Sequence, residues 1–361
     1  MVERIDIIMP VYNTPGHDID LIMRSLQEQE HTNWRLCVID DGSKKETADY
    51  LDFWSGKDSR VEIYHFKNGG PPVARNRGLS LVTSAYFMLI DSDDILAPNF
   101  LSHSLELCKD YDLDLIVGAI EIIKENGEVL EICRPEVPNE TNILVYEEKK
   151  VSYLLDYALS THSNSENSEL KNALLGRLYP KLIRTELIHK NNIRFDESLF
   201  NHDDNIFSFD LFAYSNRVGL TNCIYYKYIE HEYSIVHRKA SEKILNEEIQ
   251  FIKVLRSREQ LYTIKGCKGG IAVRYLNLVM ASMAVVTSLQ ANKARDAYRK
   301  ITGLIDVRSM VGSISSSKYT LTNKEKVYYN ILKIKTPSIR ENVLCGFIAL
   351  VALYKKFRHN K

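Results

Sequence analysis

The sequence predicts an α/β protein with a mainly parallel central sheet, followed by a helical C-terminal region. In about the first 120 residues, short apolar segments alternate with helix-like segments, which is the order of parallel strands joined by crossover helices. The apolar segments there stop at polar or glycine-rich turns. After about residue 241 the chain reads as mostly helical. We therefore expect one domain at residues 1–240 and a helical region at residues 241–361.

Runs of apolar and β-branched residues predict five strands in the first domain. An amphipathic helix is predicted at residues 18–29, where Ile19, Ile22 and Leu26 share one face. From residue 121 to residue 148 the pattern weakens into a charged stretch with a turn at Asn126-Gly127. The predicted strands are Ile5–Met9, Leu36–Ile39, Val61–Tyr64, Tyr86–Ile90 and Leu113–Ile120.

Composition and charge narrow the class of protein. The 47 basic residues balance the 47 acidic ones, so the basic excess of a nucleic-acid-binding protein is missing and no nucleic acid partner is expected. Six scattered cysteines show no metal-ligand spacing, which is typical of a reducing compartment. The N-terminus has no signal-peptide pattern, and no apolar run reaches the about 20 residues that span a bilayer. We expect a cytoplasmic protein.

An acidic cluster, Asp91-Ser92-Asp93-Asp94, follows the apolar strand at Tyr86–Ile90. Three carboxylates this close raise one another's pKa unless a cation is present. Oxygen ligands suit Mg²⁺ or Mn²⁺, which proteins often hold with one or two carboxylates together with substrate phosphates. Taken alone, the cluster fits a solvated acidic turn or a helix N-cap equally well.

Two further polar loops follow other strands. Asp40-Asp41-Gly42-Ser43 offers carboxylates for a nucleobase N–H or a ribose hydroxyl, although alone it reads better as an ordinary Asp-Gly turn. Asn68-Gly69-Gly70 leads to Arg75 and Arg77 near a helix start, which suits an anionic phosphate but also an ordinary surface helix. Because loops that follow parallel strands lie at the same edge of the sheet, we expect these loops to line one shared binding crevice.

These motifs, taken in order, resemble the family 2 glycosyltransferases. The matching segments are Met9–Asn13, Val38–Ser43, Asn68–Gly70, Ala74–Gly78 and Ile90–Asp94, followed by Leu178–Arg184, Ile193–Glu197, Asp203–Phe207, Tyr225–Tyr228 and Ser234–Arg238. The resemblance covers about residues 5–240. It implies the GT-A fold, a nucleotide-binding α/β domain with a DxD metal motif.

The resemblance also implies roles for individual residues. Asp204 would be the catalytic base, and Asp203 stands where the family usually has Glu; both could instead cap a helix. Asp91, Asp93 and His237 would hold Mn²⁺ or Mg²⁺, although a lone His is more often structural. The nucleotide-sugar site would comprise Pro10, Val11, Tyr12, Asn13, Asp40, Asp41, Gly70, Arg75, Asn76, Asp91 and Ser92. Supporting residues would be Asp94, Asp203, Arg77 and Arg238.

The resulting expectation is a metal-dependent inverting transfer of a sugar from a UDP-sugar donor to a hydroxyl of a saccharide acceptor. The setting would be bacterial capsule, teichoic-acid or other cell-surface glycan synthesis. The alternative is a non-catalytic sugar-nucleotide-binding or scaffold protein of a glycan assembly complex. That alternative predicts a broken acidic cluster or a missing base, whereas both are intact here.

A short apolar segment near the C-terminus, Val343–Tyr354, is followed by Lys355, Lys356, Arg358 and Lys361. Residues 343–361 would suit peripheral contact with the anionic inner face of the plasma membrane, where a lipid-linked acceptor would be found. Packing of this helix on the protein itself, or on a second subunit in a homodimer, explains the same pattern.

Overall fold

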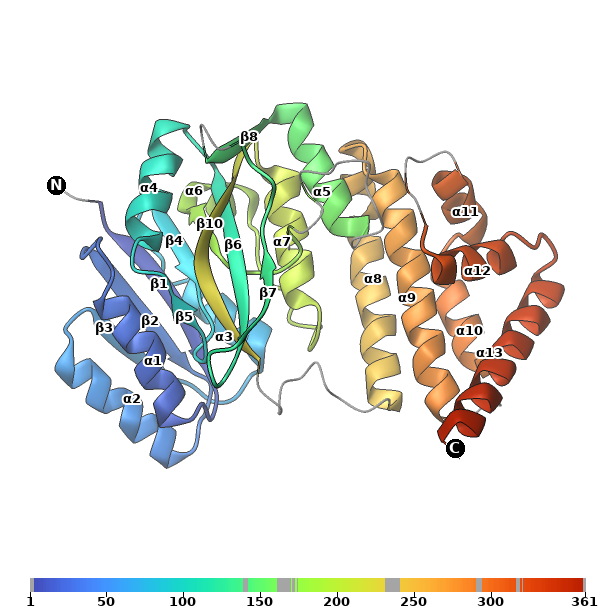
Figure 1. Ribbon diagram of the computed structural model, residues 1–361, viewed down its shortest axis with the longest axis horizontal. Helices are drawn as coiled ribbons and strands as arrows, with labels where there is room; N and C mark the ends of the chain where they lie inside the picture. Colours follow the sequence, from blue (N-terminus) through green and yellow to red (C-terminus); the bar gives the residue numbers. More distant parts are fainter. Residues whose placement is uncertain are drawn as a thin grey trace. The chain divides into compact units, whose positions relative to one another are not determined.

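The computed structural model describes residues 3–138, 142–160, 170, 173, 175–230, 241–289, 294–315, 319 and 321–359. The chain divides into two compact units (Figure 1). The first contains residues 1–154 and 169–234, and the second contains residues 155–168 and 235–361. The end of helix α5 (Val151–Ser160) therefore belongs to the second unit.

The described residues of the first unit form a ten-stranded sheet. Its strands are β1 (Ile5–Val11), β2 (Trp34–Asp40), β3 (Val61–His65), β4 (Tyr86–Leu89), β5 (Ile95–Leu96), β6 (Leu115–Lys124), β7 (Val129–Cys133), β8 (Ile143–Glu147), β9 (Lys181–Arg184) and β10 (Arg217–Glu230). Their order is β3-β2-β1-β4-β9-β6-β10-β5, with β7 beside β6 and β8 beside β10. Strands β3, β2, β1 and β4 run parallel, as predicted, whereas β9 runs antiparallel to both β4 and β6.

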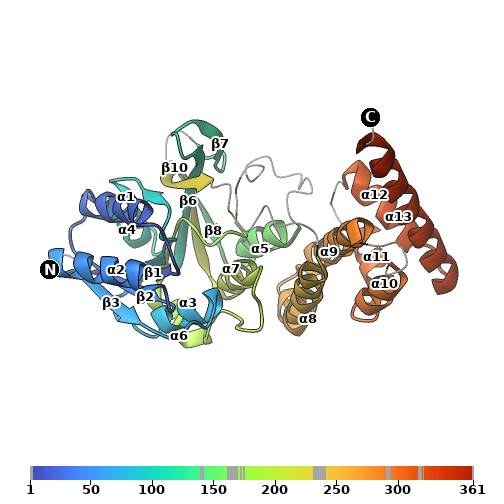
Figure 2. The ribbon, with the colours of Figure 1, turned by 90° about the horizontal axis from the view of Figure 1, so that it is seen from below.

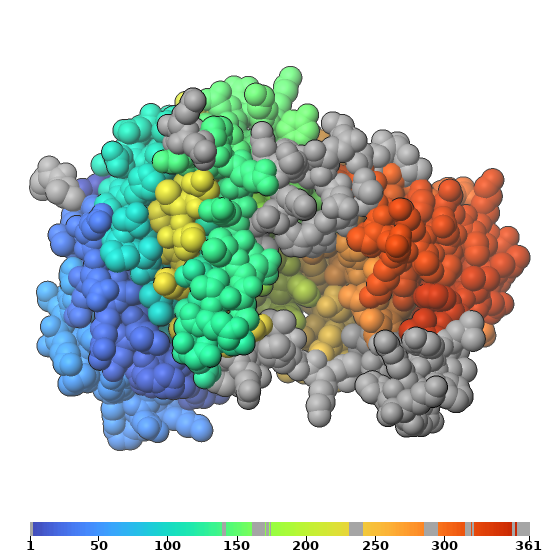
Figure 3. Space-filling view, in the orientation of Figure 1, coloured from blue at the N-terminus to red at the C-terminus, as the bar shows by residue number. Residues whose placement is uncertain are grey.

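All five predicted strands are present, and the α/β class is confirmed. The charged stretch at residues 121–148 also contains strands, which the sequence did not indicate. Gly127 makes the predicted turn, with a φ of +84°, and donates its N–H to the Lys124 carbonyl at 2.8 Å. The following strand β7 is mostly exposed, so it lacks a regular buried face; Figure 3 shows this green segment at the surface.

Helices cover both faces of the sheet. Those of the first unit are α1 (Gly16–Gln27), α2 (Lys45–Lys57), α3 (Pro71–Leu79), α4 (Phe100–Asp110), α6 (Thr185–Asn191) and α7 (Asp203–Tyr214). In Figure 2, α1 and α4 lie on one side of the strands and α3 on the other. Helix α3 approaches β1 closely at Gly78, where an added Cβ would lie 2.3 Å from Cγ2 of Ile8.

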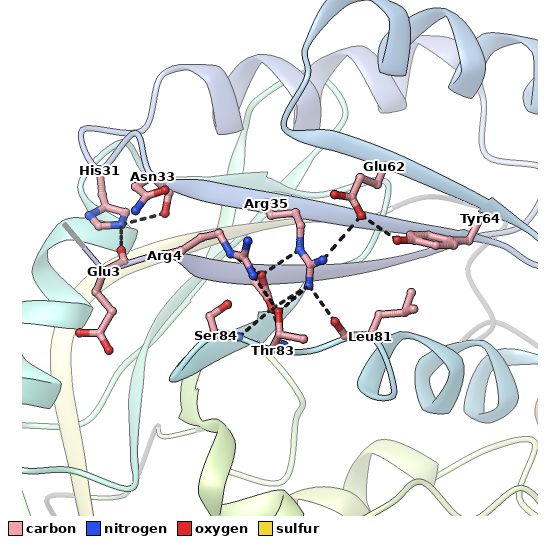
Figure 4. Close-up of polar contacts among 11 residues, drawn as sticks. Glu3, Arg4, His31, Asn33, Arg35, Glu62, Tyr64, Leu81, Thr83 and Ser84 are labelled. Carbon is pink, nitrogen blue, oxygen red and sulfur yellow. Dashed lines mark hydrogen bonds and ion pairs between the residues drawn. The ribbon is translucent and has the colours of Figure 1, made fainter. Parts of the chain in front are cut away.

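A buried ion pair holds the amino-terminal ends of the central strands (Figure 4). The carboxylate of Asp6 on β1 accepts from Arg35 Nε and Nη2 at 3.0 and 2.9 Å, and from the N–H groups of Thr83 and Ser84 at 2.7 and 3.0 Å. Burial opposes the charged form, but these bonds outweigh it and lower the pKa of Asp6. The cluster fixes β1 against β2 and the start of β4.

The second unit is helical, as predicted. Its helices are α8 (Glu242–Ile264), α9 (Lys268–Leu289), α10 (Ala294–Thr302), α11 (Val307–Ser315), α12 (Asn323–Leu332) and α13 (Pro337–His359). Helix α9 contacts each of the other five, which explains why its segment is apolar on nearly all sides. Asp156 of α5 joins this unit by accepting from the Gly270 N–H at 2.9 Å and from the Tyr319 hydroxyl.

Helix α13 contains the apolar segment predicted near the C-terminus. Leu344 and Ile348 are buried in the helical unit, whereas Ile339 and Val343 are 52% and 43% exposed. One face of the helix therefore packs on the protein. In the part of the chain that the structure describes, no helix is long and apolar enough to cross a bilayer.

Candidate active site

The predicted loops emerge at the carboxyl ends of β1, β2 and β4, on one edge of the parallel strands. Hydrogen bonds join them to one another. The Asn13 N–H donates to Ser43 Oγ at 3.0 Å, and the hydroxyls of Thr14 and Ser92 lie 2.6 Å apart. The three loops after these strands thus form one connected surface, as the sequence predicted.

The loop after β1 presents an exposed aromatic ring. Strand β1 continues through Pro10 to Val11, and Tyr12 directly after it is 58% exposed. Asn13 has a φ of +56°, a left-handed conformation that Asn tolerates better than most residues, and its Oδ1 accepts from the Lys44 N–H at 2.8 Å. The Tyr12 ring is therefore available for stacking on a planar ligand.

Asp40 is buried at the end of β2 and is hydrogen-bonded within the protein. Its carboxylate accepts from the Ser43 N–H at 2.9 Å and lies 2.6 Å from Nδ1 of His65. Nε2 of His65 lies 3.0 Å from Asp52, and the two bonds to carboxylates raise the pKa of His65. Asp40 thus shapes the loop that follows β2.

The Asp41 carboxylate holds the glycine loop in place. It accepts from the N–H groups of Gly69 and Gly70 at 2.9 and 2.8 Å and from Nη1 of Arg77 at 2.8 Å. Gly70 has a φ of +87°, which favours glycine, and helix α3 starts at the next residue. Arg77 compensates the charge of Asp41 and thereby supports the loop.

Arg75 connects segments that are far apart in the sequence. Its Nη1 donates to Asp203 Oδ2 at 2.6 Å, and its Nη2 lies 3.6 Å from Asp91 Oδ1. Burial opposes the charge of the guanidinium, but the surrounding acidic groups raise the pKa of Arg75 well above its ordinary value. Helix α3, the acidic cluster and the start of α7 therefore meet at this side chain.

Two stacked tyrosines support the acidic cluster, and the sequence did not single them out as site residues. The Tyr179 hydroxyl donates to Asp91 Oδ1, and the Tyr226 hydroxyl donates to Asp94 Oδ2 at 2.6 Å. Tyr226 also accepts from the Asp91 N–H at 3.2 Å. The two rings lie 5.2 Å apart with an interplanar angle of 6°. No spacing rule marks such tyrosines, because Tyr179, just before β9, and Tyr226, on β10, are far from the acidic cluster in the sequence.

The acidic cluster is crowded enough to favour a cation. Asp94 is buried, and burial together with the charges of Asp91 and Asp93 raises its pKa well above the ordinary value. Asp91 and Asp93 are oxygen donors of the kind that Mg²⁺ and Mn²⁺ prefer, so this donor set fits such an ion. Among the described residues, no three His, Cys, Asp or Glu side chains converge on one point. The predicted His237 and Arg238 lie outside the described residues.

The predicted base lies at the start of α7. His202 precedes the helix with a φ of +65°, and Asp203, which is buried, pairs with Arg75. Burial, followed by the charge of Asp203, raises the pKa of Asp204, whereas Arg75 and His202 act to lower it. A carboxylate with a raised pKa is a stronger proton acceptor than an ordinary aspartate.

Asn76 forms a bridge between α3 and the segment that leads to α7. Its Nδ2 donates to the Phe195 carbonyl at 3.0 Å and to Glu197 Oε1 at 2.9 Å, and its Oδ1 accepts from the Phe195 N–H at 2.9 Å. These bonds position the start of α7 relative to Arg75. The predicted contact of Asn76 with a nucleotide sugar stays a prediction.

A protein-family model and several relatives match the part of the chain that carries the loops after β1, β2 and β4. A protein-family model described as "Glycosyl transferase family 2" matches residues 6–157. The uncharacterized glycosyltransferase YibD of Escherichia coli strain K12 is 26% identical over 266 residues, which cover 72% of this chain and 71% of that protein. The uncharacterized glycosyltransferase EpsJ of Bacillus subtilis strain 168 is 24% identical, with 69% of each chain covered. Glycosyltransferase GlyG of Streptococcus pneumoniae is 30% identical over 33% of this chain, and the match spans only 39% of its length.

The fold agrees with solved structures. Residues 1–349 of S. aureus TarS superpose with a TM-score of 0.60 at 18% sequence identity, with 91% of this chain and 90% of that chain covered. A structure of the same protein in complex with UDP-GlcNAc gives a TM-score of 0.62 at 17% identity and the same coverage. The GT-A fold predicted from the motifs is thereby confirmed. The family 2 glycosyltransferase model thus matches residues 6–157, and the two relatives that match about 70% of this chain are both named as glycosyltransferases.

Proposed function

We propose that the protein transfers a sugar from a UDP-sugar to a hydroxyl of a saccharide acceptor, with inversion at the anomeric carbon and with a divalent cation. One observation carries the proposal: Arg75 joins Asp91 of the acidic cluster to Asp203, the neighbour of Asp204. The Arg75 guanidinium thus lies between Asp91, on the donor side of the proposed site, and Asp203, on the acceptor side. The UDP-GlcNAc complex of S. aureus TarS, which shares this fold, supports a nucleotide-sugar donor.

The nucleoside would lie on the loops after β1 and β2. The exposed Tyr12 ring offers a stacking surface, and Pro10, Val11 and Asn13 shape the loop that carries it. The carboxylates of Asp40 and Asp41 are engaged by protein donors, so a second hydrogen bond from a uracil N–H or a ribose hydroxyl would use their remaining lone pairs. Gly70 and Ser92 would face the ribose and diphosphate.

Arg75 would contact the diphosphate directly. Asp91, Asp93 and His237 would hold Mn²⁺ or Mg²⁺, which would in turn bind the diphosphate. A cation bound there supplies Lewis-acid stabilisation of the charge that develops on the departing nucleoside diphosphate. Arg75 adds a second positive charge, since acidic neighbours keep its guanidinium protonated. Asp94 and its bond to Tyr226 keep the cluster in shape.

The base in this proposal is Asp204. Its ionised carboxylate takes the proton of the acceptor hydroxyl while the acceptor oxygen forms a bond to the anomeric carbon. The bond from that carbon to the diphosphate oxygen breaks on the opposite face, so a single displacement inverts the centre. Asp203 stays paired with Arg75 and fixes the start of α7.

Asp204→Asn tests the base, because it keeps the size of the side chain and removes the proton acceptor. We expect unchanged UDP affinity by calorimetry and loss of UDP release from UDP-N-acetylglucosamine, UDP-glucose and UDP-galactose in the presence of Mn²⁺. Near-normal UDP release by this variant would contradict the assignment of Asp204 as the base. UDP release by the wild type that is unaffected by EDTA would overturn the metal dependence. No UDP release from any donor, with or without Mn²⁺, would favour a binding protein.

Two observations bear on the acceptor and its location. The relatives come from bacteria; one of them is the cholesterol galactosyltransferase of Borreliella burgdorferi, which is 25% identical over 62% of this chain. Ile339 and Val343 leave part of α13 apolar and exposed, just before the basic residues near the C-terminus. We propose that the protein acts in the synthesis of a bacterial surface glycan at the inner face of the plasma membrane, with a lipid-linked saccharide as the acceptor.

Neutralising the basic end of α13 tests the membrane contact without removing its buried residues. The variant K355Q/K356Q/R358Q should lose binding to vesicles that contain 30% anionic lipid (about 1 kcal/mol per basic residue). Equal sedimentation of the variant and the wild type with these vesicles would contradict the contact. The mass of the wild type by light scattering decides between a monomer and a homodimer.

A further inference from the structure

Lys181 is a lysine at the centre of the sheet that no step above uses. It starts β9, between β4 and β6, where its partner in register is Val117. The residue is 1% exposed. A buried ammonium group is costly to the fold unless its charge and its donors are compensated, so its presence here requires an explanation.

Neutral groups satisfy the donors of Lys181. Its Nζ donates to the carbonyl oxygens of Leu175, at 3.3 Å, and of Arg177, and to the Ser208 hydroxyl at 3.3 Å. These three acceptors match the three donors of an ammonium group. No ion pair with a carboxylate compensates the charge of Lys181 within the described residues.

The same contacts converge on the helix that carries Asp204. Ser208 follows Asp204 by one helical turn, and its hydroxyl donates to the Arg177 carbonyl at 3.1 Å. The Asn205 side chain donates to the Gly176 carbonyl at 2.8 Å. Residues 175–177 are therefore held along the start of α7, with the ammonium of Lys181 between the segment and the helix.

The charge of Lys181 is linked to that of Asp204. Burial lowers the pKa of Lys181 to about 7, and the charge of Asp204 acts in the opposite direction. Because the interaction is mutual, a protonated Lys181 favours the ionised form of Asp204. The largest influences on the pKa of Asp204 are its burial and the charge of Asp203, which disfavour the ionised form, and then Arg75 and His202, which favour it.

We propose that Lys181 is a positioning residue for the base: its ammonium holds residues 175–177 against α7 and places a positive charge behind Asp204. The inference rests on the proposed role of Asp204 as the base. It predicts a specific pH dependence, because Lys181 aids Asp204 only while the ammonium is protonated. Its effect should be largest in the acidic range, where Asp204 would otherwise take up a proton, and should fade as the pH rises past about 7.

Three variants separate charge from packing. Lys181→Gln keeps an NH₂ group that can donate to the Leu175 and Arg177 carbonyls but carries no charge. Lys181→Met removes both the charge and the hydrogen-bond donors. Ser208→Ala removes a neighbouring hydroxyl and leaves the ammonium. The readouts are kcat and KM for UDP release from the best of the three UDP-sugars between pH 5.5 and 9, the Kd for UDP, and Tm.

We expect Lys181→Gln to bind UDP normally and to lose kcat only on the acidic side of the pH profile, by at most about tenfold for a rise of one unit in the pKa of the base, with the loss disappearing above pH 8. Ser208→Ala removes one of the three acceptors but keeps the charge, so its loss at acidic pH should be smaller than that of Lys181→Gln. A Lys181→Gln profile that superimposes on the wild type, or is lowered equally at every pH, would overturn the proposal. If Lys181→Met does not fold, Lys181→Gln decides alone. Should Asp204→Asn retain activity, the base assignment fails, whereas a failure confined to Lys181→Gln leaves that assignment intact.

Discussion

Arg75 and Asp203 form a hydrogen-bonded ion pair at 2.6 Å between residues 128 positions apart in the sequence. The pair joins α3, which follows the glycine loop, to α7, which carries Asp204. Since Arg75 also lies 3.6 Å from Asp91, its planar guanidinium sets the separation of the acidic cluster and the base. The Asp203 side chain is long enough to complete this pair.

Arg75→Lys should therefore keep a positive charge but lose the fixed geometry. A lysine ammonium cannot contact Asp203 and Asp91 in the same fork-like way. We expect kcat for UDP release to fall about 100-fold, as for a displacement of about 1 Å in an active site, with a smaller change in KM. Steady-state kinetics with Mn²⁺ measure this. A kcat within twofold of the wild type would show that charge alone suffices.

Tyr226→Phe tests the support under the acidic cluster. The change removes the donor to Asp94 and the acceptor for the Asp91 N–H, and leaves the stacked ring in place. Losing a buried bond to a charged group should reduce the free energy of unfolding by about 1.5–3 kcal/mol. Chemical denaturation measures this loss. Tyr64→Phe, which removes a hydroxyl bonded to the half-exposed Glu62, is the matched control and should cost less.

Asp6→Asn should destabilise the fold without changing the site. It leaves Arg35 without its buried charge partner, at a cost of about 3–5 kcal/mol. Because the pKa of Asp6 is lower in the folded state than in the unfolded state, its stabilisation is present above the unfolded pKa and is lost as the pH falls through the folded one. Denaturation from pH 7 to pH 3 should show the variant converging with the wild type. A changed Kd for UDP would contradict the separation of this cluster from the site.

The sequence predicted the parts of the fold and site that depend on local pattern. Strands with an all-apolar run, such as Ile5–Met9, and the loops after them were predicted because burial and turn residues leave direct marks. The strand at Val129–Cys133 was missed because its exposed residues follow no periodicity. Tyr179, Lys181 and Tyr226 were missed as site residues for another reason: each acts through a partner brought near only by the antiparallel insertion of β9 and the course of β10. The role of Asp203 toward Arg75 is likewise a property of the tertiary structure.

Two helical glycines should respond oppositely to alanine. At Gly78 an added Cβ would lie 2.3 Å from Ile8 on a central strand, so Gly78→Ala must push α3 away from β1 and should cost about 1–3 kcal/mol. Gly56 in α2 has open space around the same position and a helical backbone, so Gly56→Ala should stabilise the protein by about 0.5–1 kcal/mol. Urea denaturation of both variants measures the difference. Since Arg75 and Arg77 lie on the helix that Gly78→Ala displaces, that variant should also bind UDP more weakly, whereas Gly56→Ala should bind it normally. Equal stability of the two variants would show that α3 can move without loss, and would argue against close packing of this helix as the basis of the site.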